Sequence, residues 1–182
     1  MASKHPHHHA HPAVDAASTR NAGQCVRRQT PAINANRRVA LIACSATKAT
    51  VEEAAHHFYR GTLFRKSVRF AEKTCDEWAV LSAKHGLVLP SDRIQPYNET
   101  LYQKTPAERA AWTNRVLERI REKWCRTPCT FVFLAGARYR DGLVAQLATL
   151  PDISVEAPLQ GLGIGQQLHF LTPREIHDDV IS

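Results

Sequence analysis

Three short apolar runs, separated by stretches with helical periodicity, place the strongest constraint on how this chain can fold. The runs are residues 39–43, 78–82 and 130–135. A continuous apolar run of this length is typical of a strand that is buried on both faces, as in a parallel sheet. Helical segments connect the runs, and a weaker fourth strand is expected at 153–156. The pattern therefore predicts an α/β fold of three layers, with a mostly parallel central sheet of about four strands flanked by helices.

Helical periodicity and capping signals locate the helices between these strands. Residues 62–75 have one apolar face, and residues 105–124 begin with a capping box that has proline at the first helical position. Shorter helices are expected over 138–149 and 166–171. The large apolar residues of the 105–124 helix recur every four positions and are expected to face the core: Trp112, Val116, Ile120 and Trp124.

Two further capping patterns and one proline-containing stretch complete this prediction. Residues 50–53 read Thr-Val-Glu-Glu, which matches a capping box and predicts that a short helix starts there. Residues 172–175 match the same pattern and predict a final turn. Residues 83–103 contain Pro90 and Pro96, so we expect this stretch to be irregular rather than one regular element.

Composition divides the chain into a tail and one domain. Residues 1–36 are rich in His, Ala, Pro and Arg, show no periodicity and are expected to be disordered, whereas residues 37–182 are expected to form a single domain. The formal net charge is +7, which is compatible with a phosphate-bearing partner. The charge falls short of the dense basic stripe of a dedicated DNA-binding protein. The sequence does not identify an oligomeric state or a cofactor.

The cellular location follows from what the chain does not contain. No apolar run reaches the roughly 18–20 residues that span a bilayer, so no membrane association is expected. The N-terminus lacks the apolar core of a secretory signal, and the five cysteines are an odd number without framework spacing. We therefore expect a reduced, cytoplasmic protein. No His, Cys or carboxylate cluster in the expected domain has ligand spacing, so no metal site is predicted.

Lys84 and His85 are the most distinctive polar residues, because they directly follow a buried strand and are closed by Gly86. Parallel sheets bind ligands at the carboxyl edge of their strands, where such a pair supplies one cation and one titratable imidazole. We interpret both as candidate catalytic residues. The alternative is that His85 bonds only the backbone of its own loop. Asp92 is the nearest carboxylate and either orients His85 or caps a turn.

The loop after the first strand contains Cys44, Ser45, Thr47 and Lys48. Hydroxyls, a lysine and backbone amides near a helix start suit a phosphate or another anion, so Ser45, Thr47 and Lys48 are candidate ligand-binding residues. A merely polar turn is the alternative. Cys44 is a candidate nucleophile, since a thiol near a helix N-terminus and a lysine is activated. Its alternative role is that of a small buried residue that ends a strand.

Four residues farther along the chain are candidates for contact with a ligand. Tyr59 and Tyr97 can stack on a base or donate a hydroxyl, although a core tyrosine is the alternative for Tyr59. Gly163 lies in a glycine-rich loop, residues 159–165, that either brings the backbone close to a ligand or makes a tight turn. Gln166 follows this loop and, together with its neighbour Gln167, can read the polar edge of a base.

The order of these motifs resembles the YaaA-like superfamily, and most closely a bacterial and phage branch of it. The resemblance covers about residues 38–171. It rests on Ala-Cys-Ser-Ala-Thr-Lys at 43–48, Phe-Tyr-Arg-Gly-Thr-Leu-Phe at 58–64, Leu-Ser-Ala-Lys-His-Gly-Leu at 81–87, Ile-Gln-Pro-Tyr at 94–97 and Gly-Leu-Gly-Ile-Gly-Gln-Gln-Leu at 161–168. The resemblance implies an α/β fold with a central cleft. The site residues that it implies are Cys44, Ser45, Lys48, Tyr59, Lys84, His85, Pro96 and Tyr97.

Two functions follow from these observations as hypotheses. The first is an enzyme that acts on a nucleotide or a nucleic-acid base, because distant YaaA-like relatives are proposed to act in nucleobase modification. Lys48 would hold a phosphate, Lys84 would stabilise negative charge, and His85 would move a proton. The second is a non-catalytic DNA-binding protein of the peroxide-stress type, whose partner is nucleic acid. A third interpretation assigns the loop residues to packing alone.

Overall fold

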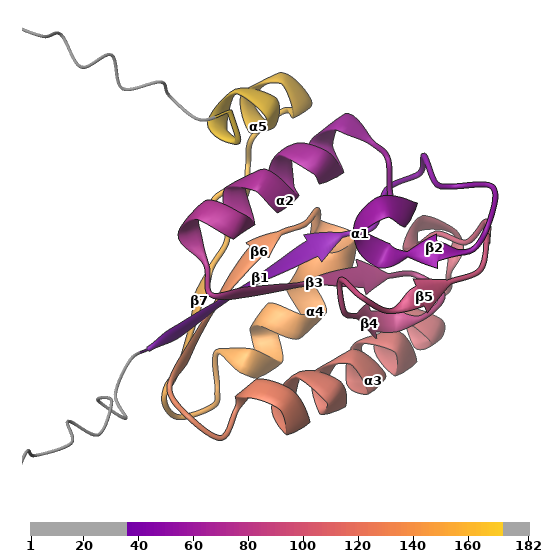
Figure 1. Cartoon of the computed structure of the whole chain (residues 1–182). Coiled ribbons are helices and arrows are strands. Elements are labelled where there is room, and N and C mark those ends of the chain that lie inside the picture. Colours follow the sequence, from indigo (N-terminus) through magenta and orange to yellow (C-terminus); the bar gives the residue numbers. More distant parts are fainter. Residues whose placement is uncertain (1–35, 173–182) are drawn as a thin grey trace, which may run out of the picture. The chain divides into compact units, whose positions relative to one another are not determined.

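The computed structural model describes residues 36–172, which form a five-stranded sheet with helices on both faces (Figure 1). The strand order is β4-β3-β1-β6-β7. The strands are β1 (Arg37–Ala43), β3 (Glu77–Ser82), β4 (Gly86–Val88), β6 (Cys129–Leu134) and β7 (Ile153–Glu156). Strands β1, β3, β6 and β7 are parallel, and β4 is antiparallel to β3. The expected three-layer, mostly parallel α/β fold is confirmed.

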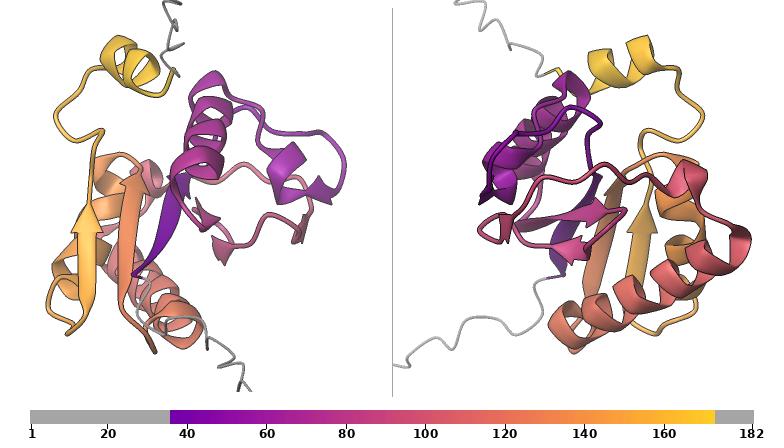
Figure 2. Two further views of the ribbon diagram at one scale, coloured as in Figure 1. Left: turned by 60° about the vertical axis from the view of Figure 1, so that its left-hand side comes forward. Right: turned by 90° about the vertical axis from the view of Figure 1, so that its right-hand side faces the viewer.

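The helices divide between the two faces of the sheet (Figures 1 and 2). Helices α2 (Thr62–Thr74) and α5 (Ile164–Phe170) lie over one face, and α3 (Pro106–Trp124) and α4 (Ala137–Leu147) lie over the other. Alternate residues of each central strand point to opposite faces, so each face has its own apolar core. In β1, Val39 and Leu41 pack toward α3 and α4, while Ala40 and Ile42 pack toward α2.

Helix α3 follows its sequence signals closely. The Thr105 hydroxyl accepts a hydrogen bond from the Glu108 N–H at 3.3 Å, and the Glu108 carboxylate accepts one from the Thr105 N–H at 2.7 Å. This reciprocal capping box fixes the start of the helix. The expected core stripe is confirmed, since Trp112, Val116, Ile120 and Trp124 are all buried.

Strand β4 is a difference from the sequence prediction, which placed residues 83–103 in an irregular stretch and expected about four strands. Gly86 has a φ of 72°, a left-handed conformation that favours glycine and lets the chain reverse within three residues of β3. The reversal pairs Ser82 with Gly86 and Val80 with Val88. A three-residue strand is too short for a periodic pattern in the sequence to reveal it.

The helix start expected at residues 50–53 is wrong. Glu53 and Ala54 form strand β2 (Glu53–Ala54), which pairs antiparallel with β5 (Arg93–Ile94). Helix α1 (Ala55–Phe58) begins only afterwards, and its N-cap has no side-chain bond. Backbone carbonyls of Asp92 and Pro90 accept the N–H groups of Ala55 and His56, at 2.9 and 3.1 Å. The neighbouring segment therefore sets this start, rather than a local capping box. A short 3₁₀ helix, η1 (Leu101–Gln103), precedes α3.

The remaining helix predictions agree with the structure to within two residues: 62–75, 138–149 and 166–171 correspond to α2, α4 and α5. The expected tail, residues 1–36, and the turn at 172–175 fall almost wholly outside the described residues. Within residues 36–172, no helix combines the length and the apolar character needed to cross a membrane.

Candidate functional site

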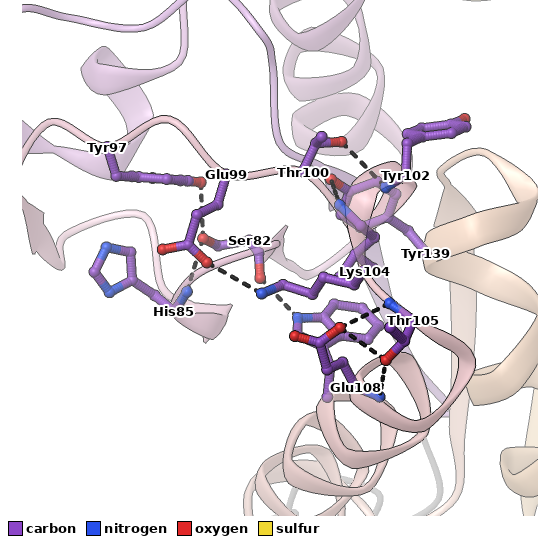
Figure 3. A network of polar contacts seen from close by, with 12 residues as sticks. Ser82, His85, Tyr97, Glu99, Thr100, Tyr102, Lys104, Thr105, Glu108 and Tyr139 are labelled. Atoms are coloured by element: carbon purple, nitrogen blue, oxygen red, sulfur yellow. Dashed lines mark hydrogen bonds and ion pairs between the residues drawn. The ribbon is translucent and has the colours of Figure 1, made fainter.

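The loops that follow β1, β3 and β6 meet at one edge of the sheet, because these strands run parallel. This edge carries most of the polar residues that the sequence singled out. The segment from residue 95 to residue 100, which joins β5 to η1, crosses the same edge and supplies Tyr97. Figure 3 shows the polar network that results on the side of β3 and α3.

A chain of three hydroxyls forms the base of the site. The Tyr97 hydroxyl lies 2.8 Å from the Ser82 hydroxyl and 3.0 Å from the Tyr59 hydroxyl. Ser82 is the last residue of β3 and is fully buried, and its hydroxyl accepts the backbone N–H of His85 at 3.1 Å (Figure 3). The indole N–H of Trp112 donates to the Ser82 carbonyl at 2.8 Å. These bonds fix the turn that carries Lys84 and His85.

The two tyrosines are held in their neutral form. Burial raises the pKa of Tyr59 to about 12. Burial also raises the pKa of Tyr97 well above its ordinary value, and the neighbouring Cys44 and Tyr59 act in the same direction. Both phenols therefore keep their protons at neutral pH, so they can donate hydrogen bonds but cannot act as bases.

Two lysines and one histidine surround the Tyr97 ring. The Lys48 ammonium lies 4.7 Å from the ring centroid, and the Lys84 ammonium lies 5.8 Å from it. The His85 ring meets the Tyr97 ring edge-on, with centroids 5.2 Å apart. Cations at these distances are attracted to the electron-rich ring. Within residues 36–172, neither lysine forms an ion pair with a carboxylate, so both charges are open to an anionic ligand.

The electrostatic surroundings of His85 favour its neutral form. Partial burial lowers the pKa of His85, the positive charge of Lys84 lowers it further, and Glu99 opposes the shift. The imidazole is therefore a proton acceptor at neutral pH. Of the two roles expected for Asp92, the structure supports turn capping, because the carboxylate accepts the Leu89 N–H at 2.8 Å. Glu99, which forms an ion pair with Lys104 at 3.1 Å, is the carboxylate that acts on His85 (Figure 3).

These surroundings predict how the His85 pKa responds to its neighbours. Lys84→Met should raise the pKa toward its ordinary value of 6.5, because a positive charge is removed. Glu99→Gln should lower the pKa further, because the only opposing influence is lost. The measurement is an NMR titration of the imidazole protons, with His85→Gln used for assignment and Lys123→Met as a distant control. Opposite directions of change, or no change in either variant, would contradict this electrostatic arrangement.

Cys44 lies beside a cavity of about 280 Å³ at the same edge. Its sulfur is 3.5 Å from the Tyr139 hydroxyl of helix α4, which also accepts the Leu101 N–H at 3.5 Å. Burial and the adjacent Cys44 raise the pKa of Tyr139, so this phenol too remains protonated. Cys44 thus contacts the Tyr139 hydroxyl through its sulfur and also forms part of the cavity lining.

Ser45 also lines the cavity, but its hydroxyl serves the fold as well. It accepts the N–H of Gly61, the N-cap of α2, at 3.0 Å. Thr47 is exposed, and its carbonyl accepts the Arg60 N–H at 2.9 Å. The loop after β1 is therefore tied to the start of α2 at two points, which positions Lys48 near Tyr97.

The structure does not bring Gly163 and Gln166 to this site. The Gln166 side chain accepts the Gly163 N–H at 3.0 Å, so these two residues cap helix α5. Gln166 borders a separate, mostly apolar groove of about 710 Å³ between α2 and α5. The adjacent residue, Gln167, lines the cavity beside Cys44 instead.

The sequence prediction missed three residues that build the site: Trp112, Tyr139 and Gly61. Trp112 was expected only in the core, yet its indole holds the Ser82 carbonyl. Tyr139 comes from a helix whose neighbours cannot be read from local spacing. Within the described residues, no group of three His, Cys, Asp or Glu side chains is placed to hold a metal ion.

Comparison with protein families gives one match, to a model described as a family of unknown function, DUF6884, over residues 39–173. This chain belongs to DUF6884. No curated protein matches the sequence. The DUF6884 match spans the sheet from within β1 to β7 and includes all of the candidate residues described above.

Proposed function

We propose that this chain is an enzyme that acts on a nucleotide or a nucleic-acid base. The observation that supports the proposal is the position of the Lys48 and Lys84 ammonium groups around one tyrosine ring, with neutral His85 beside them. Two cations beside one ring, without a carboxylate partner among residues 36–172, create a local positive potential that attracts phosphate. A neutral imidazole next to that potential can remove a proton from a bound molecule.

Each residue has a distinct role in this proposal. Lys48 and Lys84 hold the anionic part of the ligand and stabilise negative charge that develops on it. His85 moves the proton, and Ser82 holds its loop in place through the backbone bond. The Tyr97 hydroxyl, protonated at neutral pH, donates a hydrogen bond. Tyr59 is only 1% exposed, so its ring offers no face on which a base can stack.

The resemblance to the YaaA-like superfamily supports the class of substrate, because relatives of that superfamily are proposed to modify nucleobases. Membership of DUF6884 carries no activity with it. The site residues and the resemblance therefore support the proposal separately. Cys44 is the nucleophile that this proposal offers, since it lines a cavity at the same edge of the sheet as the two lysines.

Separate substitution of the two lysines tests the proposal. Lys48→Ala and Lys84→Ala should each weaken the binding of nucleoside 5′-monophosphates about tenfold or more, as expected for loss of a charge-assisted contact. Isothermal titration calorimetry measures this change. Lys123→Ala is the matched control, because Lys123 also lies over an aromatic ring, 5.2 Å from Trp124, but is paired with Glu77. Unchanged affinity in both lysine variants would refute the phosphate site.

Titration of the same lysine variants with duplex DNA tests a second candidate function, that of a non-catalytic DNA-binding protein. Helix α2 favours this alternative, because Arg65, Arg69 and Lys73 are all exposed along it. Such a surface would bind duplex DNA with an affinity that falls steeply as salt is raised, since each phosphate contact releases a counterion. Salt-sensitive binding of DNA that ignores Lys48→Ala and Lys84→Ala would favour this candidate over the enzyme.

A further inference from the structure

The cavity beside Cys44 is lined without charged side chains, in contrast to the nearby site of the two lysines. Neither a lysine, an arginine, a histidine nor a carboxylate is among the described residues that border its volume of about 280 Å³. Its polar groups are the Cys44 thiol, the hydroxyls of Ser45, Thr62 and Ser67, and the Gln167 amide. This volume lies just below the range of about 300–1,000 Å³ that is usual for drug-sized ligands. A single uncharged ring fits such a space better than a charged group.

Two helices start at the wall of this cavity without a side-chain cap. Helix α2 begins after Gly61 and helix α4 after Gly136, and both glycines line the cavity. The first N–H groups of any α-helix have no partner within the helix. In most helices a Ser, Thr, Asp or Asn side chain accepts one of them, but neither N-cap here does so. The start of α2 therefore offers backbone donors to the cavity, and the N-cap of α4, Gly136, borders the same space.

Two side chains complete the polar lining. Ser67 is 1% exposed and borders the cavity, so its side chain is part of the lining rather than of the outer surface. Gln167 donates its amide N–H₂ to the Leu162 carbonyl at 2.7 Å, which leaves its amide oxygen free to accept. Donors and one acceptor thus surround a space whose lining is partly polar and partly apolar.

We infer that this cavity is the subsite for the uncharged ring of the ligand, a nucleobase or a similar heterocycle with carbonyl oxygens, while Lys48 and Lys84 hold its phosphate. This inference rests on the proposed function and adds an orientation to it. The loop after β1 joins the two subsites, since Cys44 and Ser45 line the cavity and Lys48 reaches the Tyr97 ring. Ring carbonyls face the starts of α2 and α4, and the Gln167 oxygen accepts from a ring N–H or amino group. The Cys44 thiol then faces the ring rather than the phosphate.

Binding of separate parts of a nucleotide tests the inference. The probes are the four common ribonucleosides, ribose 5-phosphate and the four 5′-monophosphates, each titrated by calorimetry. Ser67→Leu, which fills the cavity, should weaken nucleoside binding about tenfold or more and leave ribose 5-phosphate binding within about twofold. Lys48→Ala should show the reverse pattern. In wild-type protein, nucleosides should shift the backbone amide NMR signals of Leu63 and Ala137, at the starts of α2 and α4.

A second cavity variant keeps the test valid if Ser67→Leu does not fold. Gln167→Met should also weaken nucleoside binding, and Gln160→Met, an exposed glutamine outside the cavity, should not. Monophosphate binding that depends on the lysines but is unaffected by the cavity variants would overturn this inference and leave the proposed function intact. Failure of all monophosphates to bind wild-type protein would overturn both.

Discussion

Replacing Trp112 by alanine should destabilise the fold by roughly 3–5 kcal/mol, the usual cost of truncating a large buried aromatic side chain. Trp112 is 1% exposed and packs edge-on against Tyr139, with ring centroids 5.7 Å apart. Its loss would leave a cavity between α3 and α4 and would also remove the hydrogen bond to the Ser82 carbonyl. Chemical unfolding followed by circular dichroism measures the change in the free energy of unfolding.

The conservative change Trp112→Phe separates packing from the effect on the site. It keeps most of the apolar volume but removes the donor to Ser82, so it should shift the NMR signals of His85, which is bonded to the Ser82 side chain. Trp124→Phe is the matched control. Trp124 is equally buried in α3, but its indole N–H bonds Glu77, at the opposite end of β3, where water can replace it. Equal shifts of the His85 signals in both variants would contradict a specific role for Trp112.

Gly61→Ala should destabilise the protein by about 1–3 kcal/mol, the usual cost of overpacking. A Cβ atom at this position would lie 2.3 Å from the Ser45 hydroxyl oxygen and 3.2 Å from the Ser45 Cβ. The backbone φ of −63° suits any residue, so the requirement for glycine is steric rather than conformational. The clash would separate the loop after β1 from the start of α2. Thermal and urea unfolding measure the loss.

A second substitution shows whether Ser45 is the cause. Ser45→Gly removes both clashing atoms and should recover much of the loss in the Gly61→Ala background, whereas Ser45→Ala leaves the Cβ contact and should recover less. A double-mutant cycle reports this coupling. Gly165→Ala is the control, because nothing lies within 4 Å of its added Cβ. Gly165 is the second residue of helix α5, so this change should leave the stability nearly unchanged or raise it by less than about 0.5 kcal/mol. A Gly61→Ala protein as stable as wild type would refute the steric argument.

The parts of the fold that the sequence predicted are those with long, regular signals. The apolar runs at 39–43, 78–82 and 130–135 correspond to β1, β3 and β6, and the capping box at Thr105 marks the start of α3. The short elements β2, β4 and β5 were missed, because two or three residues cannot show a period. Their pairing depends on contacts between segments, such as that of Glu53 with Ile94.

The candidate site was likewise predicted from the sequence only in part. Parallel strands bring Lys48 and Lys84 to one edge, so their placement near each other was expected from topology alone. The hydroxyl chain from Tyr59 through Tyr97 to Ser82 was not, because it depends on the path of the segment that follows β5. The cavity likewise requires the starts of α2 and α4 to border the same space, and no local pattern in the sequence predicts that arrangement.

The central position of β1 has a consequence for how the chain is made. This strand is the first of the sheet in sequence, yet its pairing is complete only when Arg37 meets Cys129 in β6. During synthesis one side of β1 therefore stays unpaired until most of the domain has left the ribosome, and contacts so distant in sequence slow folding. An open, apolar strand edge invites pairing with other chains. We therefore expect nascent chains that end before β6 to depend on chaperones for solubility.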